Sequence, residues 1–410
     1  MSLDWTRRKA LGHGFGLAAW AMGAGALLGD RAAQAAPERV RLPFANGERE
    51  LIAFPEKRPL IVLTARPPQL ETPFEVFDQG LLTPNDAFFV RYHLSGIPTR
   101  VDADTFRLRI GGLVNTPLEL SLKDLARRFE AVERVAVNQC SGNGRGFFEP
   151  RTNGGQLGNG AMGNARWKGV ALKTLLDAAG VGAGARQVSF DGLDEPIKDG
   201  GDFVKALDID HARDGEVMVA WEMNGEALPM LNGFPLRLVV PGYYGTYWVK
   251  HLSDIRVLDS VFDGYWMKSA YRVPDNDCHC VEPGTQAKAT IPIAQFTIRS
   301  FITSLASGAE LKAGRPTEVR GIAFDAGRDI DEVAFSSDGG AHWQPTRLGT
   351  SLGRYSFRDW RTEFTPPKAG SYDLRVRAHN RAGEVQPEHA SWNAPGYLRN
   401  VIESTTVRAV

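Results

Sequence analysis

Two patterns of hydrophobic and polar positions divide the chain. Up to about residue 285, alternating stretches typical of half-buried strands are mixed with helical ones. One helix is expected at residues 172–179, where three leucines and Ala179 fall on one helical face. This mixture of strands and helices predicts an α+β domain over residues 36–285.

From about Ile291 onward, strand follows strand and no helix is expected. The expected strands are residues 318–323, 332–336 and 372–378, and turn signals rich in glycine lie at 338–340 and 368–370. This pattern predicts a β-sandwich of immunoglobulin type over residues 286–410. The Pro283-Gly284 pair marks the boundary between the two domains.

The first 35 residues have the pattern of a signal peptide. Arg7, Arg8 and Lys9 precede an apolar run over residues 11–28, and the small residues of Ala33-Gln34-Ala35 form a cleavage site. The paired arginines resemble a twin-arginine signal, which serves proteins that are exported already folded. We therefore expect export to the periplasm, with a plain secretory signal or a membrane anchor as the alternatives.

Charge and composition exclude several classes of partner. The 410 residues are too many for one hydrophobic core, and 48 basic side chains are balanced by 48 acidic ones. Without a basic excess, neither nucleic acid nor an anionic membrane is expected as the main partner. We find no nucleotide-binding glycine loop and no Cys-x-x-Cys-His run for attaching a c-type haem.

Cys140 is the first candidate for chemistry. Residues 134–139 alternate like a strand, and Ser-Gly-Asn-Gly at 141–144 forces a turn directly after Cys140. The thiol is thus expected at a strand end that faces a cleft built from loops. A buried, inert cysteine is the alternative, but a nearby cation such as Arg145 would favour the thiolate, the form that binds metal.

The other two cysteines occur together in Cys278-His279-Cys280. A structural zinc site needs four ligands at suitable spacing, and the sequence offers no partner pair for this segment. A structural role is favoured. In an oxidising compartment the two thiols either form a local disulfide or stay reduced.

Four segments carry a family resemblance. Residues 85–93 (NDAFFVRYH), 137–145 (VNQCSGNGR), 221–229 (WEMNGEALP) and 232–242 (NGFPLRLVVPG) resemble sulfite oxidases, in the same order along the chain. The resemblance is greatest to bacterial periplasmic sulfite dehydrogenases. It covers nearly all of the mature chain, because that family has a carboxy-terminal immunoglobulin-like dimerisation domain and residues 385–393 resemble its end.

The resemblance implies a molybdenum site with molybdopterin as its organic part. Cys140 matches the thiolate that binds the metal. The residues matching the substrate pocket are Arg91, Arg145 and Tyr271, with Arg358 reaching it from the second domain. The residues matching the cofactor contacts are Phe89, His93, Asn232, Arg237, Trp248, Val249 and Lys250. Asn232 departs from the family pattern, since many members have histidine there.

The implied activity is the two-electron oxidation of sulfite to sulfate. Sulfite is a small dianion, and guanidinium groups recognise oxyanions through paired hydrogen bonds, so clustered arginines suit it. Because no haem is encoded, a c-type cytochrome is expected as the electron acceptor, and the chain is expected as a homodimer or in a complex with a cytochrome subunit. The alternatives are a sulfane dehydrogenase or a methionine sulfoxide reductase subunit of the same superfamily, or a binding protein that has lost catalysis.

Overall fold

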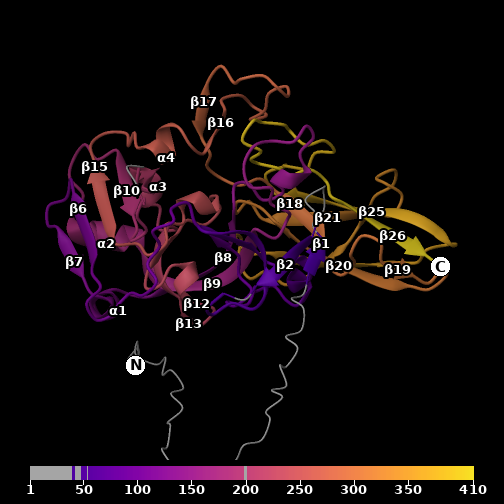
Figure 1. Ribbon diagram of the computed structural model, residues 1–410, viewed down its shortest axis with the longest axis horizontal. Helices are drawn as coiled ribbons and strands as arrows, with labels where there is room; N and C mark the ends of the chain where they lie inside the picture. The colour runs from indigo at the N-terminus through magenta and orange to yellow at the C-terminus, as the bar shows by residue number, and fades with distance from the viewer. Residues whose placement is uncertain (1–38, 42–47, 53, 198–200) are drawn as a thin grey trace, which may run out of the picture.

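The computed structural model describes residues 39–41, 48–52, 54–197 and 201–410, so the expected signal peptide at 1–35 lies outside the described residues. The molecule is elongated, and the carboxy-terminal strands, orange to yellow in Figure 1, gather at one end. No helix within the described ranges is long and apolar enough to cross a membrane.

Three sheets build the chain up to about residue 260. The first has its strands in sequence order: β1 (Arg39–Arg41), β2 (Glu48–Ile52), β3 (Leu60–Ala65), β4 (Pro68–Glu71) and β5 (Val90–Arg91). The second has the order β11 (Lys205–Asp208), β10 (Gln187–Asp191), β15 (Asp254–Leu258), β6 (Leu108–Gly112) and β7 (Leu118–Leu120). The third has the order β13 (Glu226–Ala227), β12 (Met218–Met223), β9 (Met162–Ala171) and β8 (Val132–Gln139), with β14 (Arg237–Val239) paired to β12.

The third sheet positions the predicted metal ligand. β8 and β9 pair antiparallel from Val132↔Gly169 to Gln139↔Met162, and the second half of β8 is buried on both faces. A side chain at Gly169 would place its Cβ 1.9 Å from the Val219 carbonyl oxygen, so only glycine lets β12 approach β9 this closely. β8, the edge strand of this sheet, therefore places Cys140 at its buried end.

Short helices cover the sheets. They are α1 (Leu122–Arg128), α2 (Leu172–Ala179), α3 (Ile209–Ala212) and α4 (Tyr265–Lys268), with 3₁₀ turns η1 (Phe74–Asp78), η2 (Arg145–Phe147), η3 (Met230–Asn232) and η4 (Gly245–Tyr247). α1 starts with a capping box between Ser121 and Asp124. The helix predicted at 172–179 is confirmed as α2, with its three leucines and Ala179 buried, and it ends at Gly180, whose φ is 71°.

From residue 290 onward the chain forms strands and no helix, as predicted. After the hairpin of β16 (Arg272–Pro274) and β17 (Thr290–Pro292), two sheets face each other. One consists of β18 (Arg299–Ile302), β20 (Thr317–Phe324), β24 (Arg358–Phe364) and β23 (Arg347–Leu348), and the other of β19 (Glu310–Leu311), β26 (Ser404–Ala409), β25 (Gly370–Asn380), β21 (Ile330–Ser336) and β22 (Gln344–Pro345). Val319, Phe335, Trp360 and Val376 belong to the core between them. The expected boundary near residue 285 falls in the connection from β16 to β17.

Arg299, which forms an ion pair within the sandwich, also joins the sandwich to the turn after β8. Arg299, at the start of β18, is fully buried, and its Nη2 donates hydrogen bonds to Asn159 Oδ1 (2.8 Å) and Glu403 Oε1 (2.9 Å). Its Nη1 donates to the Asn143 carbonyl oxygen at 3.4 Å. Removing one partner of a buried ion pair leaves an unpaired charge, so this contact couples the position of the second domain to the segment that follows Cys140.

Candidate active site

One pocket in the first domain collects side chains that lie far apart in the sequence. Most of the expected site residues line it, namely Phe89, Arg91, His93, Cys140, Asn232, Arg237, Trp248, Lys250 and Tyr271. The lining also includes Asn138, Ser141, Asp194, Phe203 and Thr246, which were not among the expected site residues. The fold therefore brings together the segments around residues 90, 140, 235, 248 and 271.

Cys140 is the free thiol of the chain, because the other two cysteines are bonded to each other. It lies at the end of β8 with 8 % of its surface exposed. Its N–H donates to the Ala161 carbonyl (2.9 Å), and its own carbonyl accepts from Asn143 N (3.0 Å), closing the turn predicted at 141–144. Gly144 adopts φ 85° in this turn. The thiol is thereby held at the pocket by fixed backbone on both sides.

The Arg237 cluster, made of Asn232, Arg237 and Trp248, forms one part of the pocket. Arg237 is 3 % exposed and its guanidinium carbon lies 5.6 Å from the Trp248 ring centroid. It donates to the carbonyl oxygens of Asn232 (3.0 Å) and Trp248 (3.4 Å). Burial lowers the pKa of Arg237 to about 9, which shows how little water reaches this charge.

Lys250 brings a second buried cation to the same pocket. Its Nζ donates to the Arg91 carbonyl at 2.6 Å and lies 3.0 Å from the centroid of the Tyr92 ring. Burial, and then the neighbouring Arg237, hold the pKa of Lys250 well below its usual value. Asp194 is the acidic residue of the lining, and burial raises its pKa to about 6 although Lys250 opposes this. Positive groups outnumber negative ones, so an anionic ligand would offset their burial.

Unpartnered polar atoms test whether these residues fit the cofactor. Ser141 Oγ, Thr246 Oγ1, Asn138 Oδ1 and Arg237 Nε are buried without a hydrogen-bond partner among the described residues, and all four residues line the pocket. Buried polar atoms are normally satisfied. Four of them around one pocket, beside a free thiol and an excess of cations, fit a large polar anion such as molybdopterin with its metal.

The Tyr271 cluster, made of His93, Phe203, Tyr271 and Tyr397, forms another part of the site. His93 Nε2 and the Tyr271 hydroxyl share a hydrogen bond. Phe203 stacks on His93 with ring centroids 4.0 Å apart, and Tyr397 stacks on Tyr271 at 5.5 Å. Burial lowers the pKa of His93 well below its usual value and raises that of Tyr271, so the hydrogen-bonded pair stays uncharged at neutral pH. Tyr271 has φ 58°, a conformation uncommon outside glycine and often found at functional sites.

Arg145 contacts this cluster through Tyr397 and is not among the residues that line the pocket. Its Nε donates to the Pro395 carbonyl (2.8 Å), its Nη1 donates to the Gly155 carbonyl (3.2 Å), and its guanidinium carbon is 5.1 Å from the Tyr397 ring centroid. The segment after Cys140 thus brings Arg145 close to the site, while a tyrosine from the second domain stands next to Tyr271.

Two further expected residues lie outside the lining. Val249 packs in the core between the lining residues Trp248 and Lys250, with 1 % of its surface exposed. Arg358 starts β24, where it pairs with Ala323 of β20. Val249 can therefore act on the cofactor only through its neighbours. Tyr397 of the second domain stacks on Tyr271, whereas Arg358 lies in the sandwich sheet.

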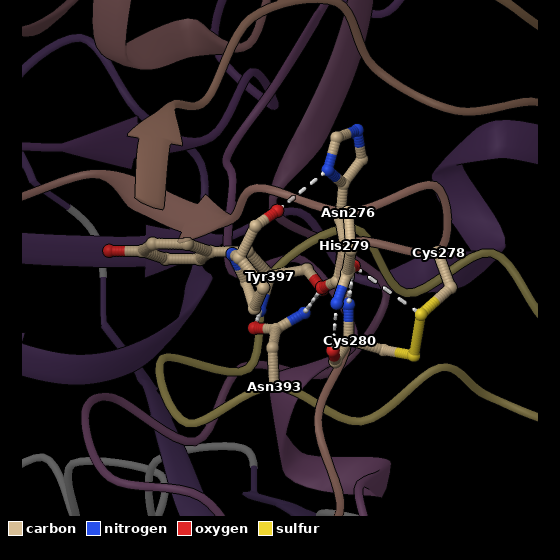
Figure 2. The surroundings of a disulfide bond; sticks show 7 residues. Asn276, Cys278, His279, Cys280, Asn393 and Tyr397 are labelled. Carbon is tan, nitrogen blue, oxygen red and sulfur yellow. Dashed lines mark hydrogen bonds between the residues drawn. A yellow bond between two sulfur atoms is a disulfide. The ribbon is translucent and has the colours of Figure 1, made fainter. Parts of the chain in front are cut away.

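The disulfide loop supports the segment that carries Tyr397. Cys278 and Cys280 are bonded to each other, which resolves the two alternatives for these thiols (Figure 2). Buried Asn393 donates to the carbonyl oxygens of His279 (3.4 Å) and Tyr397 (2.9 Å), and its Oδ1 accepts from Tyr397 N (2.9 Å). The loop and the Tyr271 cluster therefore share Asn393 as a common support.

Sequence reasoning missed Asp194, Thr246 and the buried Lys57, which bonds Asn232. Thr246 lies between Gly242, the last residue of a family motif, and Trp248, an expected site residue, and this position in the sequence is the signal that could have identified it. Asp194 and Lys57 stand in polar stretches with no distinguishing spacing. Only the three-dimensional arrangement identifies them.

Comparison with known protein families assigns both halves of the chain. The oxidoreductase molybdopterin binding domain matches residues 94–266, and the Mo-co oxidoreductase dimerisation domain matches residues 290–409. These two matches confirm the predicted fold class, a molybdopterin-binding domain followed by a dimerisation domain.

Individual relatives agree with these matches. Sulfite oxidase of Gallus gallus is 33 % identical over 386 residues, covering 89 % of this chain and 80 % of that protein. Sulfite oxidase of Arabidopsis thaliana is 28 % identical over 87 % of this chain and 96 % of its own length. The sulfane dehydrogenase SoxCD from Paracoccus pantotrophus has a similar structure, with a TM-score of 0.71, 25 % identity and coverage of 94 % of this chain and 93 % of that one. The chain therefore belongs to the sulfite oxidase family and is an oxidoreductase that uses the molybdenum cofactor.

Proposed function

We propose that this protein oxidises sulfite to sulfate and passes the electrons to a c-type cytochrome in the periplasm. The observation that carries the proposal is the excess of cations around a buried free thiol: Arg91, Arg237 and Lys250 line the pocket of Cys140 together with one carboxylate, Asp194. Such a pocket favours anions over neutral substrates. The relatives named sulfite oxidase support the choice of sulfite among anions.

Each residue of the pocket has a part in this chemistry. When bound, the molybdenum cofactor supplies the two-electron redox chemistry. Cys140 provides the soft sulfur ligand that holds the metal. Arg91 is the charged side chain placed to orient the sulfite oxygens by paired hydrogen bonds.

The Tyr271 cluster supplies hydrogen bonds without adding charge. The Tyr271 hydroxyl shares its hydrogen bond with His93, and the raised pKa of the phenol, caused by burial, keeps its proton in place at neutral pH. A protonated phenol beside Arg91 can donate to a sulfite oxygen and then rebond to His93. Stacking on Tyr397 limits the motion of the ring.

A sulfane dehydrogenase is the second candidate. It is favoured by the similarity to SoxCD over nearly the whole chain. Both candidates need the metal site and differ in the sulfur compound that is oxidised. Assays with sulfite and with a sulfane-sulfur compound, on the same preparation, separate the two.

The dimer, the export and the electron acceptor belong to the same proposal. The match to a dimerisation domain supports a homodimer, and a complex with a cytochrome subunit is the alternative assembly. The pattern at residues 1–35 supports export.

The test is sulfite-dependent reduction of an added acceptor. We expect the purified chain to contain molybdenum, to show no haem absorbance, and to reduce ferricyanide and cytochrome c when sulfite is added. Cytochrome reduction should weaken at high ionic strength if charges guide the transient contact. A molybdenum-loaded protein that leaves both acceptors oxidised in the presence of sulfite would refute the proposed substrate.

A further inference from the structure

Lys57 is a buried cation outside the pocket lining, next to the Arg237 cluster. Its side chain is 6 % exposed, and no carboxylate lies within ion-pair distance of it among the described residues. Its Nζ donates hydrogen bonds to the carbonyl oxygens of Asn85 (2.6 Å) and Phe88 (3.0 Å) and to Asn232 Oδ1. These three bonds use all three N–H groups of the ammonium.

The contact with Lys57 determines which way the Asn232 amide points. When protonated, the Lys57 amine can only donate, and Asn232 then presents its oxygen to Lys57 and its nitrogen to the other side. Asn232 Nδ2 donates one N–H to the Phe89 carbonyl at 3.2 Å. Its second N–H has no acceptor among the described residues, although Asn232 is 2 % exposed and lines the pocket. A buried donor of this kind needs an acceptor from a ligand.

Hydrogen bonds also hold the main chain around Asn232. Glu56, which precedes Lys57, accepts a hydrogen bond from Met230 N (2.9 Å) at the start of η3, and Arg237 donates to the Asn232 carbonyl (3.0 Å). Two adjacent residues of the amino-terminal segment thus hold both ends of η3. Glu56 reaches the main chain of η3, whereas Lys57 contacts the amide side chain that lines the pocket.

The charge of Lys57 also favours an anionic ligand in the pocket. Burial lowers the pKa of Lys57 to about 7, the carboxylate of Asp86 opposes this shift, and the nearby charge of Arg237 adds to it. Its three acceptors are two main-chain carbonyls and an amide, none of which carries a compensating charge. Asp86 compensates the charge in part, and an anion bound at the Arg237 cluster would compensate it further.

We propose that Lys57 is a positioning residue for the molybdenum cofactor: it turns the Asn232 amide so that an N–H faces the pocket and donates to an acceptor atom of the anionic pterin group. This inference rests on the cofactor assigned by the family and not on sulfite as the substrate. A fully loaded wild-type protein that fails to oxidise sulfite would therefore refute the proposed function and leave this inference standing.

Substitutions at both ends of the contact test it, with molybdenum per chain and fluorescence of the released pterin as readouts. Asn232→Asp keeps an acceptor for Lys57, now with full charge, but removes the N–H and places a carboxylate toward the anion. We expect cofactor content to fall at least about tenfold, the scale of losing a supporting contact in a metal site. Lys57→Met frees the amide to rotate, and we expect a loss of several-fold.

Glu56→Ala is the matched control, because it removes the neighbouring hydrogen bond to η3 without touching the amide. It should keep wild-type cofactor content. The same variants, produced in a strain that makes no molybdopterin, give the thermal stability of the fold alone, where Asn232→Asp should match or exceed wild type.

Three results would overturn the proposal. They are full cofactor content in Asn232→Asp, full content in Lys57→Met, or an equal loss in Glu56→Ala and Lys57→Met. If Lys57→Met does not fold, Asn232→Asp decides alone. An aspartate at this position still accepts a hydrogen bond from Lys57, so a purely structural role would be kept. It has no N–H to donate to the cofactor, so a cofactor-binding role would be lost.

Discussion

The Arg237 cluster and the Tyr271 cluster belong to one site but are supported by different parts of the chain. Arg237 is held by the carbonyl oxygens of Asn232 and Trp248, all within the first domain. Tyr271 is backed by Tyr397 of the second domain. Tyr397 is held by Asn393 and contacts Arg145. Changes in the second domain should therefore affect the Tyr271 cluster first.

This difference separates two tasks of the site. In the proposed function, main-chain carbonyls fix the cofactor side, because an anion of constant shape is bound best by donors that do not move. The substrate side depends on contacts across the domain boundary, where small shifts change the packing of side chains. We expect substitutions around Arg237 to alter cofactor content, and those around Tyr271 to alter the Michaelis constant of a fully loaded enzyme.

Cys140→Ser should have the largest effect, because it removes the ligand that both clusters serve. Hydroxyl and thiol are similar in size, so the fold should survive, but the hard oxygen replaces the soft sulfur that the metal needs. We expect sulfite oxidation to fall below detection, a greater loss than the ~10–100-fold that accompanies loss of an outer contact in a metal site. Circular dichroism confirms folding, and near wild-type turnover by this variant would exclude Cys140 as the ligand.

Arg91→Gln and Arg145→Gln compare the two arginines that sequence reasoning assigned to the substrate. Arg91 lines the pocket, so losing its charge should reduce kcat/KM by about 2–5 kcal/mol, the range for truncating a desolvated charge pair. Arg145 acts through Tyr397, and because glutamine can keep one of its two hydrogen bonds, losing the stacking and the other bond should remove only about 1–2 kcal/mol. Steady-state kinetics at equal molybdenum content should show the loss mainly in KM. Equal losses in the two variants would contradict the assigned geometry.

Much of this arrangement could be predicted from local patterns. Helix α2 follows from the spacing of its leucines, and the strands of the sandwich follow from alternation between glycine-rich turns. Cys140 could be placed at a strand end because 134–139 alternates and Ser141 to Gly144 must turn. Each of these predictions depends on residues that are neighbours in sequence, where sterics and burial act directly.

The remaining part depends on contacts between distant segments. Arg145 is five residues from Cys140, yet its side chain turns to Pro395 and Tyr397, about 250 residues away in sequence. No local pattern distinguishes an arginine that lines a pocket from one that stacks on its wall. For the same reason nothing near Lys57 in the sequence indicates that its ammonium bonds Asn232, since the three oxygens that surround it come from separate segments.

Glu71→Gln should reveal how the Glu71 carboxyl makes the free energy of unfolding depend on pH. Glu71 is 1 % exposed, its Oε2 accepts from Gly158 N (3.1 Å), and burial raises the pKa of its carboxyl from 4.5 to about 7. Between these two pH values the folded protein keeps a proton that the unfolded chain releases, so the free energy of unfolding falls as pH rises, by up to about 3 kcal/mol. Denaturant unfolding from pH 4.5 to 7.5 should show this slope in wild type and a smaller one in Glu71→Gln. An identical slope would show that Glu71 is ionised throughout.

Loss of the Cys278–Cys280 disulfide should have the smallest effect and gives the finest test of how the second domain supports Tyr271. The bond closes a loop of only two residues' separation, so by the loop-entropy argument it stabilises the fold by no more than about 1–2 kcal/mol. The double substitution Cys278→Ser with Cys280→Ser should therefore change kcat/KM only slightly. Asn393→Ala should raise KM more, because buried Asn393 joins His279 directly to Tyr397. Michaelis constants for both variants at equal molybdenum content check this order. A larger rise in KM for the disulfide variant than for Asn393→Ala would mean that the sulfur bridge, and not the asparagine, holds Tyr397 against Tyr271.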